Sequence, residues 1–277
     1  MIWHDGRLLP GDRVDLPWAD RTFEHGLGLF ETFRTWGGVA AYLDRHHARL
    51  LRSAAALGIP IVPASLPDAA AVADLVAAEG RPDALVRLTA TGGQPGRHPA
   101  MVWMTTAPLP PGPPESGYRV ADAGWTVALE DPLARHKSLN YWSKRLAHER
   151  AQAEGFDEAI FASADGRAWE GSRTNLFLVS GRDLVTPTTD GPLVPGILRG
   201  VILELAAEAG LHVVEADVTA DLIATADEAF LTNSVRGIIP IGSWTGRHEP
   251  SPGSDFPIAR HLTTLCHEHA TRQARPS

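Results

Sequence analysis

The stretch from residue 107 to residue 114 reads Ala-Pro-Leu-Pro-Pro-Gly-Pro-Pro, and it divides the chain. Each proline fixes its own φ angle and lacks a backbone N–H, so such a run belongs neither in a helix nor in the middle of a sheet. It predicts an extended, semi-rigid connection. We place the domain boundary there, with an N-terminal small domain over residues 1–107, a linker over 108–117 and a C-terminal large domain over 118–277.

Hydrophobic patterns on both sides of the linker predict a mixture of helices and strands. Apolar spacing and a following glycine predict an amphipathic helix over residues 43–57. Further helices are expected over 68–79, 141–154, 195–209 and 256–271, and an Asp-Gly turn predicts a hairpin over 3–8. Short apolar runs predict strands over 85–89, 101–105, 158–161, 176–179, 228–232 and 238–241. Strands from two separate regions, interspersed with a few helices, indicate an α+β fold in two parts.

Composition limits the class of protein. Of the 277 residues, 44% are hydrophobic and 21% are charged, so a folded chain is expected. The net charge of −8, without blocks of like charge, argues against nucleic-acid and membrane partners. There is no run of about 20 apolar residues and no signal-peptide pattern. The single Cys266 cannot form an intrachain disulfide, and we expect a cytoplasmic protein.

The 12 histidines do not form a metal-binding pattern. His46-His47 and His267-Glu268-His269 lack the spacing of a zinc-protease helix, and no cysteine cluster exists. We therefore expect no metal. Gly26-Leu27-Gly28 lacks the third glycine of a dinucleotide fingerprint and precedes a strand-like segment.

Lysine is nearly absent, because Lys137 and Lys144 are the only two in the chain. A surviving lysine is often just a solvated surface charge, but a deprotonated lysine amine can attack a carbonyl, which arginine cannot. Lys137 stands in Arg-His-Lys-Ser-Leu-Asn-Tyr-Trp, and Glu170 follows in Trp-Glu-Gly-Ser-Arg-Thr-Asn-Leu-Phe. A lysine for a Schiff base and an acid for a pyridine nitrogen are the groups that pyridoxal 5′-phosphate chemistry requires.

Three places could bind the phosphate of such a cofactor. They are Arg49 on the first long helix, the start of the helix that opens at Pro195, and the loop Thr232-Asn233-Ser234 after a strand. Free N–H groups and the positive end of the dipole make a helix start suitable for an anion. Each feature also has an ordinary alternative, which is a solvated helix face or a helix start that faces water.

Taken together, these segments resemble the fold-type IV family of pyridoxal-phosphate enzymes. The family contains branched-chain aminotransferases, D-amino-acid aminotransferases and aminodeoxychorismate lyases. The resemblance runs from about residue 3 to residue 270 and keeps the order of the family's motifs. It implies a small N-terminal α/β domain, a larger C-terminal α/β domain with a barrel-like sheet, pyridoxal 5′-phosphate as the cofactor, and a homodimer with the active site close to the interface.

The resemblance also assigns roles to residues. Lys137 would be the catalytic residue. It would hold the cofactor as an internal aldimine and then, as a base, remove the α-proton of the substrate, which produces a carbanion. Glu170 would pair with the pyridine nitrogen, and Arg49 with the phosphate. Further cofactor contacts are expected at Tyr141, Arg173, Thr174, Ile197, Leu198, Asn233 and Ser234. Leu198 departs from the family's usual threonine, and Leu27 replaces a common aspartate.

Among the family's activities, aminodeoxychorismate lyase is the preferred expectation. The Lys-Ser-Leu-Asn-Tyr form, Phe30-Glu31-Thr32 and the segment 231–240 look lyase-like, and the products would be 4-aminobenzoate and pyruvate on the way to folate. Substrate contacts are expected at Thr32, Arg97 and Arg236. Two alternatives stay open: a D-amino-acid or branched-chain aminotransferase that uses 2-oxoglutarate, and a non-catalytic protein that binds the cofactor.

Overall fold

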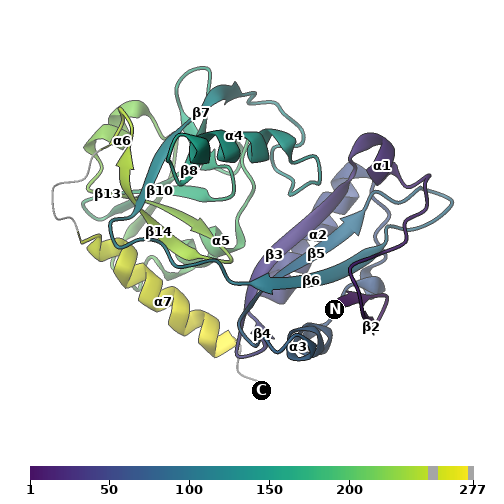
Figure 1. The fold of residues 1–277 in the computed structure, drawn as a ribbon. Coiled ribbons are helices and arrows are strands. Elements are labelled where there is room, and N and C mark those ends of the chain that lie inside the picture. The colour runs from purple at the N-terminus through teal and green to yellow at the C-terminus, as the bar shows by residue number, and fades with distance from the viewer. Residues whose placement is uncertain (249–254, 274–277) are drawn as a thin grey trace. The chain divides into compact units, whose positions relative to one another are not determined.

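The computed structural model describes residues 1–248 and 255–273, and its chain forms two compact units (Figure 1). The first unit comprises Met1–Pro110, His136–Tyr141 and the chain from His269, and the second comprises Pro111–Arg135 and Trp142–Glu268. The chain thus passes between units inside the proline-rich stretch. Lys137 belongs to the first unit, although it follows that stretch in the sequence.

A six-stranded antiparallel sheet forms the centre of the first unit, with the order β2-β1-β6-β5-β3-β4. Two helices with buried apolar residues, α2 and α3, accompany it, together with the short α1 and a 3-10 turn at Pro63–Ser65. The bounds are β1 Ile2–His4, β2 Arg7–Leu9, α1 Arg21–His25, β3 Gly28–Trp36, β4 Val39–Ala40, α2 Leu43–Leu57, α3 Ala69–Ala78, β5 Ala84–Thr91 and β6 Val102–Pro108.

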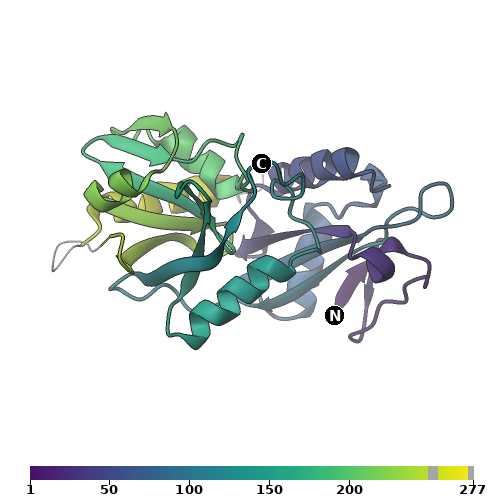
Figure 2. The ribbon, with the colours of Figure 1, turned by 90° about the horizontal axis from the view of Figure 1, so that it is seen from above.

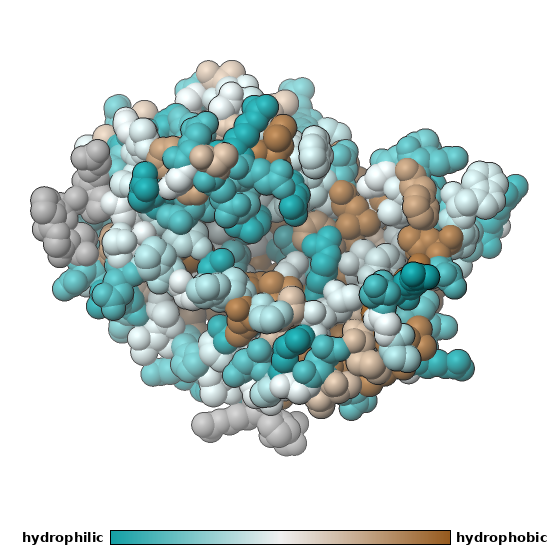
Figure 3. All heavy atoms as spheres, in the orientation of Figure 1, coloured by the Kyte–Doolittle hydropathy of each residue, from teal (hydrophilic) through white to brown (hydrophobic). Residues whose placement is uncertain are grey.

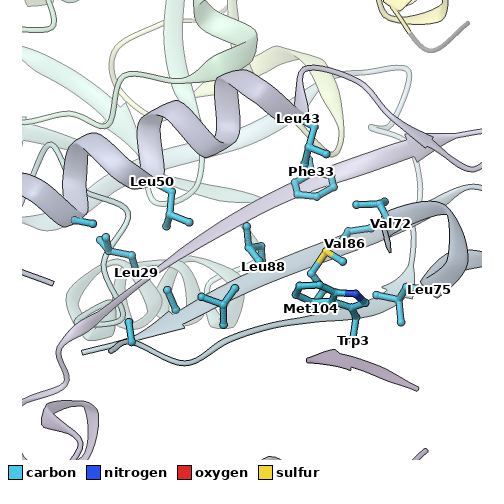
Figure 4. Packing of buried hydrophobic residues seen from close by; sticks show 14 of the residues in the cluster. Trp3, Leu29, Phe33, Leu43, Leu50, Val72, Leu75, Val86, Leu88 and Met104 are labelled. Atoms are coloured by element: carbon cyan, nitrogen blue, oxygen red, sulfur yellow. The ribbon is translucent and has the colours of Figure 1, made fainter. Parts of the chain in front are cut away.

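The two faces of this sheet differ in chemistry. Leu29 and Phe33 of β3 pack with Leu88 of β5 and with Leu50 of α2 in one buried cluster (Figure 4). Because successive side chains of a strand alternate, Phe30 and Thr32 lie on the opposite face, as does Arg87, which is paired with Thr32 in the register. One face therefore holds the core, and the other presents polar and aromatic groups.

The second unit contains an eight-stranded sheet in the order β12-β11-β10-β13-β14-β7-β8-β9, and β9 also pairs with β10. This extra pairing closes the six strands from β10 through β9 into a barrel. Figure 2 shows α4 on the outside of it, where α4 contacts β7 and β8. The bounds are β7 Tyr118–Val127, α4 Trp142–Ala153, β8 Glu158–Ser163, β9 Ala168–Gly171, β10 Asn175–Ser180, β11 Asp183–Thr186, α5 Ile197–Leu205, β12 His212–Glu215, α6 Ala220–Thr225, β13 Glu228–Asn233, β14 Gly237–Trp244 and α7 Pro257–Gln273.

The α+β fold in two parts is confirmed, and so are the long helices. The predicted helix over 43–57 is α2, and the one over 68–79 is α3 with Asp68 as its N-cap, where the carboxylate accepts the Ala71 N–H. Strands of four residues, such as β9, β11 and β12, were not predicted. A segment this short cannot display the alternation of apolar and polar residues by which a strand is identified. The strand β7 was also missed, since charged and polar residues interrupt its apolar positions.

Apolar side chains also reach the surface of the first unit. Trp18 is 81% exposed and Phe23, in α1, is 67% exposed. Figure 3 shows hydrophobic atoms at the surface in the part of this unit where α1 lies. Within the described ranges, no helix has both the length and the apolar character that crossing a membrane requires.

Candidate active site

Backbone hydrogen bonds attach the segment around Lys137 to the start of β3. The Phe30 N–H donates to the Lys137 carbonyl at 2.9 Å, and the Leu139 N–H donates to the Gly28 carbonyl at 2.9 Å. Gly28 adopts a φ of +145°, and a Cβ atom there would lie 2.5 Å from Leu139 Cδ1 and 2.7 Å from the Ala90 carbonyl oxygen. Only glycine permits this close approach, so residue 28 helps to determine where Lys137 lies.

The Lys137 amine lies among aromatic rings. Its Nζ atom is 4.4 Å from the centroid of the Phe30 ring and 5.8 Å from that of Tyr141. The two rings contact each other edge to face, with centroids 5.3 Å apart. The structure thus brings together Lys137 and Tyr141, two of the residues that the sequence predicted for the cofactor site. Thr32 follows on the same face of β3 as Phe30.

Arg49 is buried and held by a carboxylate that the sequence analysis did not identify. Its Nε atom donates to Glu31 Oε1 at 2.9 Å, and its Nη2 atom donates to Glu31 Oε2. His46 Nδ1 lies 2.7 Å from the same Oε2 atom and donates to it, since an ionised carboxylate only accepts. This fork uses the edge of the guanidinium formed by Nε and Nη2. Arg49 is therefore fixed in orientation, as the predicted phosphate contact requires.

Glu31 stays ionised over the whole physiological pH range. Burial raises the pKa of its carboxyl group, but the Arg49 charge and the hydrogen bonds from Arg49 and His46 outweigh burial and lower the pKa to about 2. Burial lowers the pKa of His46 and, together with the charges of Arg49 and Lys137, outweighs the hydrogen bond and the charge of Glu31, which raise it. A neutral His46 thus supports an ionised Glu31.

Arg87 is a second functional candidate that the sequence analysis missed. Its guanidinium carbon lies 3.9 Å from the centroid of the Phe30 ring, which also contacts Lys137. Burial lowers the pKa of Arg87. Across residues 1–248 and 255–273, no carboxylate lies within ion-pair distance of it. A half-buried arginine without an acid is a candidate for binding an anionic ligand. Its only signal in the sequence was a charge within the apolar strand 85–89.

In the second unit, the buried Glu170 organises the loop that precedes α5. Glu170 Oε2 accepts the Val194 N–H at 3.0 Å, and Oε1 accepts a hydrogen bond from the Lys144 amine. Asn175 Nδ2 donates to the Val194 carbonyl at 2.9 Å. Both backbone groups of Val194 are thus held by residues that pair with each other between β9 and β10.

The start of α5 lies against the same group of residues. A Cβ atom on Gly196, the N-cap, would lie 1.9 Å from Asn175 Oδ1. The N–H groups of the first helical turn, which includes Ile197 and Leu198, have no acceptor within the helix. They fit the predicted phosphate site, and backbone N–H groups do not depend on the threonine that Leu198 replaces.

The third predicted phosphate element lies at the end of β13. Asn175 is paired with Thr232, so Asn233, the last residue of β13, and Ser234, which follows it, come at the end of the barrel where Glu170 and Asn175 pair. The Asn233 side chain accepts the N–H groups of Val235 at 3.0 Å and Arg236 at 2.8 Å. Its side-chain oxygen therefore shapes the turn.

Other predicted contacts have different surroundings. Arg173 is exposed, with Nη2 3.3 Å from His148 Nδ1, and the Thr174 hydroxyl lies 3.4 Å from Glu158. Arg97 is exposed in the turn between β5 and β6, and Arg236 donates to the Pro111 carbonyl. A ligand role for these four residues rests on the resemblance alone. The described ranges contain no group of three or more side chains suited to holding a metal ion.

The comparisons with known proteins agree on one family. The family model of amino-transferase class IV matches residues 28–244. The chain belongs to this family. It is 34% identical to a putative branched-chain-amino-acid aminotransferase of Methanocaldococcus jannaschii, over 81% of this chain and 82% of that protein. It is 29% identical to the D-alanine aminotransferase of Bacillus licheniformis, over 95% and 94% of the two chains. The aminodeoxychorismate lyase of Bacillus subtilis is also 29% identical, over 99% of each chain.

The solved structures confirm the fold-type IV architecture and the cofactor. The branched-chain aminotransferase from Thermoproteus uzoniensis has a TM-score of 0.86 and 27% identity, and the match covers 98% of this chain and 95% of that chain. Another branched-chain amino acid aminotransferase of similar fold was solved with pyridoxamine 5′-phosphate. As a member of this family, the protein described here uses pyridoxal 5′-phosphate. The residues described above fit this group, because the chain offers an amine at Lys137, a buried acid at Glu170, and phosphate donors at Arg49 and at the start of α5.

We predict that Lys137→Ala abolishes the visible absorption band of the cofactor-loaded enzyme. This band belongs to the imine between the cofactor and an amine, whereas the unlinked aldehyde absorbs at shorter wavelength, and the amine of Lys144 is engaged by Glu170. Absorption spectra of the two proteins at equal cofactor content test this, and Lys144→Ala, which should keep the band, is the matched control. An unchanged band in the Lys137 variant would contradict the assignment.

We further predict that Glu31→Gln makes the free energy of unfolding less dependent on pH in the acid range. The pKa of Glu31 falls from 4.5 to about 2 on folding, so its contribution to stability is present above pH 4.5 and is lost as pH falls toward 2. Urea unfolding at pH 7 and pH 3 should show a lower midpoint for the variant at pH 7 and a smaller loss on acidification than in the wild type. Equal losses in both proteins would refute the low pKa of Glu31.

Proposed function

We propose that this enzyme is a cytoplasmic aminodeoxychorismate lyase, which releases 4-aminobenzoate and pyruvate on the way to folate. The observation that carries the proposal is the position of Thr32. Thr32 is paired in register with Arg87, on the face of the β3–β5 pair that also presents Phe30, the ring next to Lys137. The similarity to an aminodeoxychorismate lyase over 99% of each chain supports it.

A lyase of this kind needs an anion site and a proton for the leaving group. Arg87 would bind a substrate carboxylate, because its half-buried guanidinium has no acid partner among the described residues. The Thr32 hydroxyl would donate a proton to the oxygen of the departing enolpyruvyl group. Transamination loses no such group, so a hydroxyl at this place favours the lyase.

The remaining steps use residues of the family's motifs. The bound cofactor supplies an electron sink for the bond that breaks. The Lys137 amine would take the proton from the substrate carbon at Nζ. Phe30 and Tyr141 would exclude water from this amine, since both rings lie against it. Glu170 would provide the negative charge opposite the pyridine nitrogen.

Transamination is the second candidate function. The 34% identity to a putative branched-chain aminotransferase and the similarity to a D-alanine aminotransferase favour it. Arg87 suits this reaction as well, because an amino acid also carries a carboxylate. The hydroxyl of Thr32 is the feature that separates the two proposals.

A panel of substrates tests the choice. We expect a higher kcat/KM for aminodeoxychorismate than for D-alanine or L-leucine with 2-oxoglutarate, because only the lyase substrate uses the Thr32 proton. Product formation is measured as 4-aminobenzoate for the lyase and as glutamate for the transaminations. A larger kcat/KM with either amino acid would overturn the lyase proposal in favour of transamination.

Two variants make this test specific to the site. Thr32→Val should lower the lyase kcat by about 10²-fold with little change in KM, since it removes a proton donor and keeps the shape. Arg87→Gln should act mainly on KM for every carboxylate substrate. If Thr32→Val changes lyase turnover no more than transamination, the hydroxyl has no part in the elimination.

We also propose that the enzyme is a homodimer. The large exposed side chains of Trp18 and Phe23 support this, because exposed apolar surface often marks an interface. Light scattering at assay concentration measures the mass, and a fully active monomer would contradict the proposal.

A further inference from the structure

Lys144, the second lysine of the chain, contacts the acid assigned to the pyridine nitrogen. We propose that Lys144 is a positioning residue, which serves as a resident counter-ion of Glu170. It compensates the charge of the carboxylate and orients it before the cofactor binds, and it shares that charge afterwards. The proposal does not depend on whether the enzyme is a lyase or an aminotransferase.

The geometry comes from two elements of the second unit. Glu170, in β9, is 3% exposed, and the side chain of Lys144, in the first turns of α4, is 19% exposed. The Lys144 amine donates to Oε1 of Glu170, and the Val194 N–H donates to Oε2 at 3.0 Å. A carboxylate offers about four lone-pair positions, and these two bonds use one on each oxygen.

The pair differs from an ordinary ion pair on a helix surface. Arg145, the next residue, is 67% exposed on its side chain and pairs with Glu149 one turn along α4. Such exposed pairs contribute little to stability. Lys144 instead neutralises a carboxylate that is almost fully buried, where an uncompensated charge is costly. The chain has arginine at nearly all its basic positions, yet it has lysine here.

The cofactor changes the electrostatic balance at Glu170. Without the cofactor, Lys144 is a cation that compensates this buried carboxylate. The protonated pyridine nitrogen brings a second cation to the same acid, and like charges that share one partner weaken each other's binding. Removal of Lys144 should therefore destabilise the cofactor-free enzyme more than the loaded enzyme. By linkage, the cofactor should bind the variant more tightly.

A thermodynamic cycle tests the proposal. The variants are Lys144→Met, which removes the charge, Lys144→Gln, which keeps a hydrogen-bond donor, and Lys144→Arg, which keeps the charge. Arg145→Gln is the matched control, since it removes the neighbouring exposed charge of α4. For each protein we would measure the dissociation constant of pyridoxal 5′-phosphate and the melting temperature with and without the cofactor.

We expect Lys144→Met to lower the melting temperature mainly in the cofactor-free form and to tighten cofactor binding about tenfold, near the lower end of measured couplings between close charges. Lys144→Arg should restore the wild-type values, and Arg145→Gln should leave both measurements unchanged. In a Glu170→Gln background, Lys144→Met should no longer change the dissociation constant. If Lys144→Met does not fold without cofactor, Lys144→Gln provides the same comparison.

Three results would overturn the proposal. An equal loss of melting temperature in both forms, with an unchanged dissociation constant, would make the pair purely structural. Weaker cofactor binding in Lys144→Met and Lys144→Gln would mean that Lys144 assists the cofactor instead of competing with it. A persistent effect in the Glu170→Gln background would show that Lys144 acts through another group.

Discussion

The backbone pairing between residues 137–139 and the start of β3 is the constraint on which the site in the first unit depends. It places Lys137 against Phe30, and β3 then determines which side chains accompany the amine. Residues two apart on this strand face the amine's side of the sheet, while Glu31, between them, faces α2 and holds Arg49. One strand thus positions both the reactive amine and the predicted phosphate ligand.

The predicted site residues of both units also share a pattern of charge compensation. Each buried acid of the site has a basic partner: Glu31 has Arg49, and Glu170 has Lys144. Arg87 differs, because it stacks on an aromatic ring and forms no ion pair with any described residue. In the proposed function, the two compensated acids would therefore hold the cofactor, and Arg87, which has no acid partner among the described residues, would bind the substrate.

Residue types and local patterns predicted much of this arrangement, and long-range pairing supplied the rest. The helix α2 follows from its apolar period, and Lys137 and Glu170 follow from rare residue types in informative surroundings. Glu31 and Asn175 could not be assigned from the sequence, since their partners lie 18 and 19 residues away and only folding brings them together. Closure of the barrel could likewise not be predicted from the sequence, because it depends on β9, a strand of only four residues.

The alternation of side chains between the two faces of the first sheet has an evolutionary consequence. Leu29, Phe33 and Leu88 secure the core from one side, so the alternate positions Thr32 and Arg87 can vary without disturbing it. If Thr32 and Arg87 contact the substrate as proposed, mutation at these two positions would change specificity and leave the core cluster in place. A single scaffold can diversify in this way, which agrees with the different activities named among relatives of similar sequence identity.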